Sequence, residues 1–498
     1  MNEAHASAGA ARKSLALPVC LIALVALILR SLEAWESSLW LDELHTLSHA
    51  SQPTLRALIE HVQAEFHTPL FFGFVRVFGA FEAGAWLRAI PIVSSVLVLW
   101  PLLSIARECE LSDRAALSMA WLYACLPYQV LYGSELRPYA WSGAFSVLAF
   151  VLAFSERRST ITRLAMFFLA ILLGLLTHRL MALGLCSIGL ARCFARKPNS
   201  VPLWGLVVSG GLAVAGFLPW LSAFAQQATK ARFEHQDSVG GYHLSMRLVN
   251  ELVALPSRLV TPFLRELGPG WAALEIVASG SFALVLCALF FQAWRGRRAR
   301  PAEPVLRGLW SFAFVQFLIT TLFAVWTWDR VPLQYYTPMA WAIPLLVAAT
   351  LDRVGEARAA KWFSYALALL SLLMGIGLVG GKSREDMRGG IAAVRAFADE
   401  ARSASGLEPV FSAVLAQPQQ FEHTLPYLAY APELNAIEPQ DVARPGSAEF
   451  ERPLIVLRRN LALNHALWSP ITTGRKQVRK QIVDRYLTVY WFGPALGK

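Results

Sequence analysis

A series of apolar runs separated by short basic loops constrains the fold of this chain more than any other feature of its sequence. A helix needs about 20 apolar residues to cross the hydrocarbon of a bilayer, and such runs recur between residues 15 and 379. The chain is 56% hydrophobic and 16% charged, whereas soluble proteins are about 45–50% apolar and about 25% charged. The sequence therefore predicts an α-helical protein that crosses a membrane many times.

The basic residues indicate how the predicted spans are oriented. Arginines concentrate in short loops such as 107–114, 156–158 and 295–300, and the positive-inside rule places such loops on the cytoplasmic side. The net charge of +11 is then a consequence of topology, and no nucleic-acid partner is predicted. Counted in this way, the chain begins with an uncleaved first span over residues 15–32 and has about eleven spans, among them 115–132 and 271–294.

Two stretches are predicted to lie on the outer face without crossing. Residues 69–81 are too short for a span and contain Arg76, so they favour an interfacial or re-entrant helix. Within a long outer loop, leucines recur every three or four residues over 244–259. That spacing is typical of an amphipathic helix on a membrane surface.

The composition becomes polar at Lys382, and the remaining residues are predicted to form a small soluble domain. A helical pattern covers 383–404, where apolar side chains recur along one side. The predicted strands are 410–414, 454–457 and 481–491. We therefore expect two domains, a transmembrane domain over 1–380 and a C-terminal α/β domain on the outer face over 381–498.

Four clusters of polar residues fall on the outer side of this topology. The first places two adjacent carboxylates beside a tryptophan, where the first span emerges into water. Ionisable groups at membrane depth cost roughly 2.5 to 3.5 kcal/mol even on lenient scales, so such groups are functional candidates. The clusters are Trp40-Leu41-Asp42-Glu43, His67-Thr68-Pro69-Leu70, Tyr132-Gly133-Ser134-Glu135-Leu136-Arg137-Pro138-Tyr139, and Asp329-Arg330 followed by Tyr335-Tyr336.

In their order, spacing and shared side, these residues resemble the GT-C superfamily of integral-membrane glycosyltransferases. The similarity is to bacterial members related to protein O-mannosyltransferases and aminoarabinose lipid A transferases, and it covers most of residues 15–350. The chain departs from the family pattern at Thr68, where proline is common, and in the four residues between Arg330 and Tyr335. The resemblance implies a polytopic GT-C fold with interfacial helices on the outer face.

The resemblance also implies a reaction. Such enzymes transfer a sugar, with inversion, from a polyprenyl phosphate to a hydroxyl of a glycan, lipid or protein acceptor on the outer, periplasmic face of the bacterial cytoplasmic membrane. A single displacement with inversion needs a base for the acceptor proton and a cation for the departing phosphate. Carried over residue by residue, Asp42 is the expected base, Glu43 its acidic neighbour and Glu135 the second acidic position.

Cations and aromatic rings complete the expected site. Arg137 and Arg330 are expected to bind the donor phosphate, because a guanidinium can contact two phosphate oxygens at once. His67 and His178 are additional candidate donors to the phosphate. The expected aromatic contacts to the substrate are Trp40, Tyr139 and Tyr336.

Most of these residues also have a structural interpretation. Arg137 and Arg330 would anchor helix ends at the interface, His178 would cap a helix, and the tryptophans and tyrosines would form aromatic belts. A divalent metal held by Asp42, Glu135 and a histidine would find suitable oxygen and nitrogen ligands. The sequence leaves the cofactor open.

Two other functions suit a membrane protein of this composition. A transporter or flippase for a lipid-linked sugar would carry ionisable groups near the bilayer midplane, on broken helices of paired repeats. Here the span centres are nearly free of charge, and no repeat is visible. A non-catalytic assembly subunit would bind a partner through its C-terminal domain, yet this sequence carries both acidic clusters. The glycosyltransferase hypothesis is therefore preferred.

Overall fold

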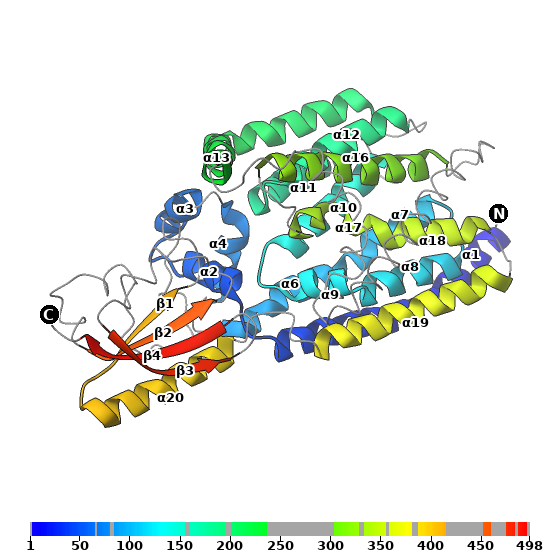
Figure 1. Ribbon diagram of the computed structural model, residues 1–498. Helices are drawn as coiled ribbons and strands as arrows, with labels where there is room; N and C mark the ends of the chain where they lie inside the picture. The colour runs from blue at the N-terminus through cyan, green and yellow to red at the C-terminus, as the bar shows by residue number, and fades with distance from the viewer. Residues whose placement is uncertain are drawn as a thin grey trace. The chain divides into compact units, whose positions relative to one another are not determined.

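The computed structural model describes most of the chain, and its helices and strands form two compact units (Figure 1). The described residues are 2–64, 67–79, 84–154, 160–195, 201–236, 303–327, 333–354, 358–380, 387–414, 452–459, 475–483 and 487–495. The helical unit comprises Met1–Glu33, Thr54–Phe74 and Arg88–Gly381, and the sheet unit comprises Ala34–Pro53, Val75–Leu87 and Lys382–Lys498. The predicted domain boundary after residue 380 stays a prediction. Two segments before residue 88, Ala34–Pro53 and Val75–Leu87, belong to the same unit as the C-terminal residues.

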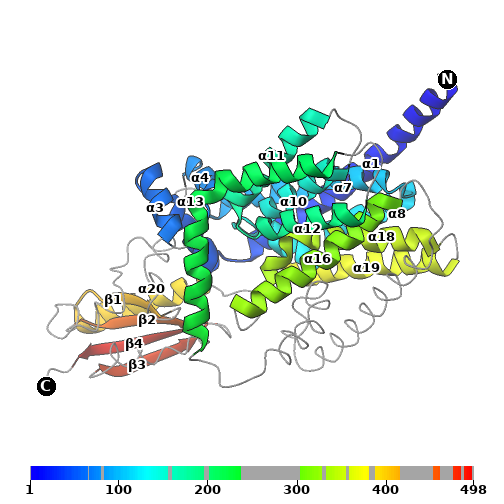
Figure 2. The same ribbon diagram turned by 90° about the horizontal axis from the view of Figure 1, so that it is seen from above.

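Helices account for about 80% of the described chain. They are α1 (Asn2–Glu36), α2 (Leu41–Ala50), α3 (Leu55–Ala64), α4 (Pro69–Val77), η1 (Gly84–Arg88), α6 (Ala89–Leu97), α7 (Leu99–Glu108), α8 (Asp113–Cys125), α9 (Pro127–Ser134), α10 (Tyr139–Phe154), α11 (Thr160–Thr177), α12 (Met181–Phe194), α13 (Leu203–Gln236), α16 (Glu303–Thr327), η3 (Leu333–Tyr336), α17 (Thr337–Ala340), α18 (Ala342–Val354), α19 (Arg358–Gly380) and α20 (Met387–Ser405). In the helical unit, α11 packs between α10 and α13, and α12 packs against α16 (Figures 1 and 2).

Several of these helices have the length and composition of membrane spans. Within the described residues there are five such segments, and α9 with α10 makes a sixth that is bent by 114°. The five are Leu15–Glu36, Ala85–Glu108, Thr160–Thr177, Leu203–Leu221 and Pro304–Leu322. The predicted helical membrane fold is thus confirmed, while the predicted span over 271–294 and the predicted amphipathic helix over 244–259 lie outside the described residues.

One predicted span differs in the structure. Apolar spacing predicts a continuous helix over 115–132, but α8 ends at Cys125 and α9 begins at Pro127. Proline lacks a backbone N–H and its ring clashes with the preceding turn, so it interrupts a helix. Apolar composition alone does not reveal this break.

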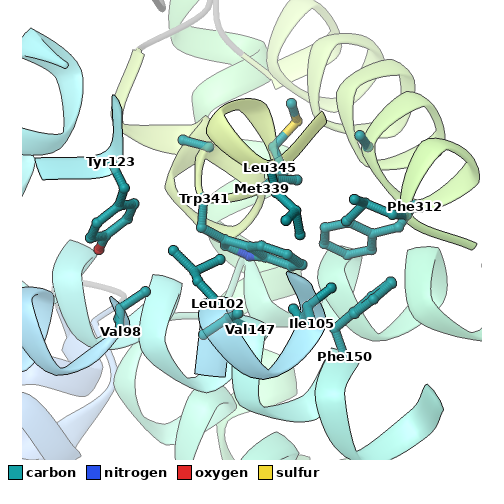
Figure 3. Packing of buried hydrophobic residues seen from close by; sticks show 14 of the residues in the cluster. Val98, Leu102, Ile105, Tyr123, Val147, Phe150, Phe312, Met339, Trp341 and Leu345 are labelled. Carbon is teal, nitrogen blue, oxygen red and sulfur yellow. The ribbon is translucent and has the colours of Figure 1, made fainter. Parts of the chain in front are cut away.

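The core of the helical unit is apolar and aromatic (Figure 3). The Trp341 ring stacks on Phe312 with 5.2 Å between ring centroids and meets Phe150 edge-on at 5.4 Å. Its indole N–H donates to the Pro338 carbonyl at 2.7 Å, so the buried polar atom is satisfied. This packing fixes α16, α10 and the start of α18 relative to one another.

The sheet unit contains a four-stranded sheet in the order β1-β2-β4-β3. The strands are β1 (Val410–Val414), β2 (Leu454–Arg459), β3 (Arg475–Ile482) and β4 (Leu487–Ala495). β1 and β2 are parallel, and β4 runs antiparallel to both β2 and β3. Helix α20 buries Ile391, Val394 and Phe397, and the Phe397 ring packs against Trp491 with 6.4 Å between ring centroids. The small α/β domain is as predicted.

The third predicted strand is wrong. Residues 481–491 do not form one strand, because β3 ends at Ile482 and β4 begins at Leu487. Only Arg475 in β3 is buried, so this edge strand lacks the alternation of apolar and polar residues that indicates a half-buried strand. The predicted strand therefore joins the last residues of β3 to the first part of β4 and misses most of β3.

Candidate functional site

The second acidic cluster lies at the sharp corner between α9 and α10. Pro138 has no backbone N–H to continue α9, so α9 ends at Ser134 and α10 begins at Tyr139. Within the corner the Glu135 backbone is extended, and the Arg137 N–H donates to the Glu135 carbonyl at 2.7 Å. The corner thus sets the directions in which the Glu135 and Arg137 side chains leave the backbone.

The side chains of this corner are buried. Glu135 is 2% exposed, Arg137 7% and Tyr139 4%. The guanidinium carbon of Arg137 lies 5.8 Å from the centroid of the Tyr139 ring, within the range of a cation–π interaction. An interfacial anchor would extend its charged end to water. Burial of both charges therefore favours a functional role for Glu135 and Arg137.

His178 belongs to the same cluster. It directly follows α11, and its ring lies 5.8 Å from the Tyr139 ring, measured between centroids. The Leu180 N–H donates to His178 Nδ1 at 3.3 Å, which assigns the ring proton to Nε2. Burial, and then the nearby charges of Arg179 and Arg137, lower the pKa of His178 to about 3. His178 is therefore a neutral donor at physiological pH, and the structure also gives it the predicted capping contact.

Protonation of His178 is expected to oppose folding in acid. Below pH of about 6.5 an unfolded histidine takes up a proton, whereas the buried ring stays neutral down to a pKa of about 3. The folded protein should therefore lose stability as the pH falls from about 6.5 to about 3. We expect the His178→Gln variant to show a smaller fall of Tm over this window, measured by thermal unfolding in detergent. An equal fall of Tm in the wild type and in His178→Gln would contradict the low pKa of His178.

Tyrosines and hydroxyl groups extend the cluster along α9 and towards η3. Tyr128 and Tyr132 lie 4.6 Å apart on α9, and Tyr132 meets Tyr139 at 5.6 Å, both between ring centroids. The hydroxyls of Tyr128 and Thr337 share a hydrogen bond of 3.1 Å. Sequence reasoning missed Tyr128, although tyrosines four residues apart on one helix face are a visible signal.

Tyr336, predicted as an aromatic contact, is buried at the end of η3. Its hydroxyl shares a hydrogen bond of 2.7 Å with Thr321 Oγ1. Tyr336 directly precedes Thr337, whose hydroxyl shares the hydrogen bond with Tyr128, so this end of η3 adjoins the tyrosines of α9. Arg330, which was predicted to bind phosphate, lies outside the described residues.

His67 lies two residues before α4, whose range Pro69–Val77 covers the first part of the short helix predicted over 69–81. Its backbone N–H donates to the Val62 carbonyl at 2.7 Å, and its ring packs against Phe72 with 5.4 Å between centroids. These contacts hold His67 against Val62 of α3 and Phe72 of α4. The donor role predicted for His67 stays a prediction.

The first acidic cluster begins α2 in the sheet unit. Trp40 is the N-cap residue, and the buried Glu43 carboxylate accepts the Trp40 N–H at 3.2 Å, as the third residue of a capping box does. Asp42 lies half-buried in the first turn, where the helix dipole favours a negative charge. The structure thus gives Glu43 a capping role, while its predicted catalytic role and that of Asp42 stay predictions.

The other end of α2 is capped by Arg76, which the sequence showed only as an interruption of an apolar run. Its guanidinium donates to the carbonyls of Ala50 at 3.3 Å, Pro53 at 2.9 Å and Gln52. A cation that donates to the last carbonyls of a helix also complements the negative end of its dipole. Arg76 therefore fixes the exit of α2.

A metal site is not assembled among the described residues. His45 and His49 form a pair four residues apart on α2, which sequence reasoning missed, with 6.4 Å between their ring centroids. In the part of the chain that the structure describes, no group of three or more His, Cys, Asp or Glu side chains is placed to hold a metal ion. The divalent metal considered from the sequence stays an open prediction.

Comparisons with known proteins rest on structure rather than on sequence. No protein-family model matches this sequence, and no curated protein is significantly similar to it. Crystal structures of ArnT from Cupriavidus metallidurans match with TM-scores of 0.52 for the form bound to undecaprenyl phosphate and 0.53 for the apo form. Each match is 14% identical in sequence and covers 95% of this chain and 97% of that chain.

A second type of solved structure matches more weakly. It is the archaeal oligosaccharyltransferase AglB from Archaeoglobus fulgidus, in complex with an inhibitory peptide and a dolichol-phosphate, with a TM-score of 0.47 and 14% identity over 90% of this chain and 69% of that chain. The likeness to ArnT, by contrast, extends over almost the full length of both chains. This chain therefore shares the fold of the ArnT structures, which is the GT-C fold expected from the sequence.

Proposed function

We propose that this protein is an inverting glycosyltransferase that moves a sugar from a polyprenyl phosphate to an acceptor hydroxyl. The observation that carries the proposal is the corner between α9 and α10, where Glu135, Arg137 and Tyr139 are buried beside the neutral His178. A buried guanidinium next to an N–H donor suits a phosphate group. The fold supports the same reaction class, since an ArnT of this fold was crystallised with undecaprenyl phosphate.

The proposed chemistry is a single displacement at the anomeric carbon of the sugar. The acceptor oxygen forms a bond to that carbon while the bond from the carbon to the phosphate oxygen breaks, so the configuration inverts. The acceptor proton passes to the Asp42 carboxylate, and the electron pair of the broken bond stays with the phosphate. The products are the glycosylated acceptor and free polyprenyl phosphate.

Cations then stabilise the charge that develops on the departing phosphate. Arg137 and the Nε2–H of His178 supply this stabilisation in the described part of the chain, and Arg330 and His67 are further candidates from the sequence. Glu135 orients Arg137 or the acceptor. Trp40, Tyr139 and Tyr336 provide aromatic contacts to the sugar.

We further propose that the site works at the periplasmic face of a bacterial cytoplasmic membrane. Support comes from the spans and from the sequence, in which the short basic loops alternate with the polar clusters. The donor tail would then lie in the bilayer, and the acceptor, a glycan, a lipid or a protein, would approach from the periplasm.

The decisive experiment uses the purified full-length protein in lipid vesicles. It is incubated with a panel of undecaprenyl-phosphate sugars and a crude envelope fraction, and free undecaprenyl phosphate and glycosylated products are quantified together. We expect both to appear in equal amounts with one donor. Movement of a donor across the vesicle membrane without any covalent product would instead identify a transporter. No release and no movement with any donor, from folded protein, would favour an assembly subunit.

A further inference from the structure

The break between α8 and α9 leaves two buried carbonyls that α9 does not satisfy. In a continuous helix the Tyr123 carbonyl would accept the N–H of residue 127, but Pro127 has none. The Ala124 carbonyl lies in the same last turn of α8, where carbonyls have no donor within their own helix. Tyr123 and Ala124 are both buried, so each carbonyl needs a donor from another part of the chain.

Arg30, near the end of α1, supplies these donors. Its Nη1 donates to the Ala124 carbonyl at 3.0 Å and to the Ala26 carbonyl at 3.1 Å, and its Nη2 donates to the Tyr123 carbonyl at 3.3 Å. The side chain is 0% exposed, and its guanidinium carbon lies 5.6 Å from the Tyr123 ring centroid. In these described contacts the cation meets carbonyl oxygens at the negative end of the α8 dipole rather than a carboxylate.

The same guanidinium also touches the far end of α9. A Cβ added at Gly133 would lie 2.6 Å from Arg30 Nε and 2.9 Å from Ser95 Oγ, so a larger residue would displace either these side chains or α9. Gly133 is two positions before Glu135, the first residue of the corner. Arg30 therefore contacts the chain at both ends of α9: where α8 ends before it, and at Gly133, next to the corner between α9 and α10.

Other contacts show that this break is a built feature of the fold. The Tyr123 hydroxyl donates to the Ser95 carbonyl at 3.0 Å, which ties α8 to α6. A Cβ at Gly375 would lie 2.7 Å from the Cys125 carbonyl oxygen. Helix α19 therefore packs closely against the carbonyl of the last residue of α8. Helices α1, α6 and α19 thus all hold the chain where α8 ends.

We propose that Arg30 is a positioning residue that holds α9 and so sets the direction of Glu135 and Arg137. The proposal rests on the proposed function, because it assigns Arg30 to the geometry of sugar transfer. Arg30 itself touches no reacting atom. A shift of about 1 Å at a reacting group costs on the order of 100-fold in rate, so a small movement of α9 has a large effect.

The test compares Arg30→Met with a matched control, Arg192→Met. Arg192 is 5% exposed and likewise donates to two carbonyls, those of Ala195 at 2.8 Å and Val201 at 3.0 Å. It lies twelve residues from Leu180 along the chain, about 18 Å along a helix, and so away from His178. We expect Arg30→Met to lower kcat about 50-fold with the donor KM changed less than threefold, and Arg192→Met to leave both within threefold.

A double-mutant cycle examines the contact with α9. Gly133→Ala is expected to lower kcat by a similar factor, because its Cβ displaces either Arg30 or α9. The double variant Arg30→Met/Gly133→Ala should then lose little more than either single variant, since both changes act on one contact. Arg30→Lys, which keeps the charge but not the planar fork, should recover part of the rate.

Hydrogen exchange separates this proposal from the proposed function. If no donor is turned over by the wild type, the proposed function fails, but amide exchange over residues 128–142 still reports whether Arg30 holds the corner. We expect exchange there to rise about tenfold in Arg30→Met and to stay unchanged in Arg192→Met. Unchanged exchange in Arg30→Met, or an equal loss of kcat in both arginine variants, would overturn the proposal.

Discussion

Replacing Asp42 with asparagine is expected to lower kcat about 1,000-fold while the protein remains folded. The amide has nearly the same size and can stay in the first turn of α2, but it cannot accept the proton of the acceptor hydroxyl. General-base catalysis typically contributes about 100- to 10,000-fold, so a residual rate from phosphate stabilisation alone should remain measurable. The measurement is the initial rate of undecaprenyl phosphate release at saturating donor and acceptor, with donor binding determined separately.

Glu43→Gln is the matched control, since it removes the neighbouring negative charge. The glutamine side-chain oxygen can still accept the Trp40 N–H that Glu43 accepts at 3.2 Å, so the cap of α2 is kept. We expect kcat to fall less than tenfold in this variant. A rate for Asp42→Asn within a few-fold of the wild-type rate would refute the assignment of Asp42 as the base. If Glu43→Gln lost more activity than Asp42→Asn, the role of base would pass to Glu43.

The sequence predicts the residues of the corner but not the contacts that surround it. Glu135 and Arg137 stand in a recognisable motif, and Pro138 indicates a helix start. The contact between Tyr139 and His178, at 5.8 Å between ring centroids, joins positions far apart in the chain. It depends on how α10 packs against α11, which no local spacing encodes. The same is true of the hydrogen bond between Tyr128 and Thr337.

Arginines show why the remaining features could not be predicted. In the sequence, Arg30 and Arg76 each appear as a single charge in an apolar run, where an interfacial anchor is the ordinary interpretation. In the structure both guanidiniums donate to carbonyls at the end of a helix. Which carbonyls lack a donor depends on where helices break and which helix lies beside them. Capping across helices is therefore visible only in three dimensions.

Replacing Arg137 with alanine is expected to lower kcat/KM about 300-fold. The phosphate gains negative charge as the bond to the sugar breaks, so a guanidinium at this position binds the transition state more tightly than the donor. Loss of one such preorganised cation costs roughly 3 to 4 kcal/mol, which corresponds to about 150- to 900-fold in rate. Most of the loss should appear in kcat, measured by the release of undecaprenyl phosphate over a range of donor concentrations.

Two further variants decide whether the effect is local. Arg137→Lys keeps the charge but cannot contact two phosphate oxygens in one plane, so we expect a rate between those of the wild type and the alanine variant. Arg56→Ala removes an arginine of α3 whose side chain is 89% exposed and paired with Glu60, and it should leave kcat/KM within twofold. If Arg56→Ala matched the loss seen in Arg137→Ala, the effect would come from the overall positive charge, which salt would screen. A near-normal rate in Arg137→Ala would instead remove Arg137 from the site, because a buried cation that binds the phosphate cannot be deleted without cost to the transition state.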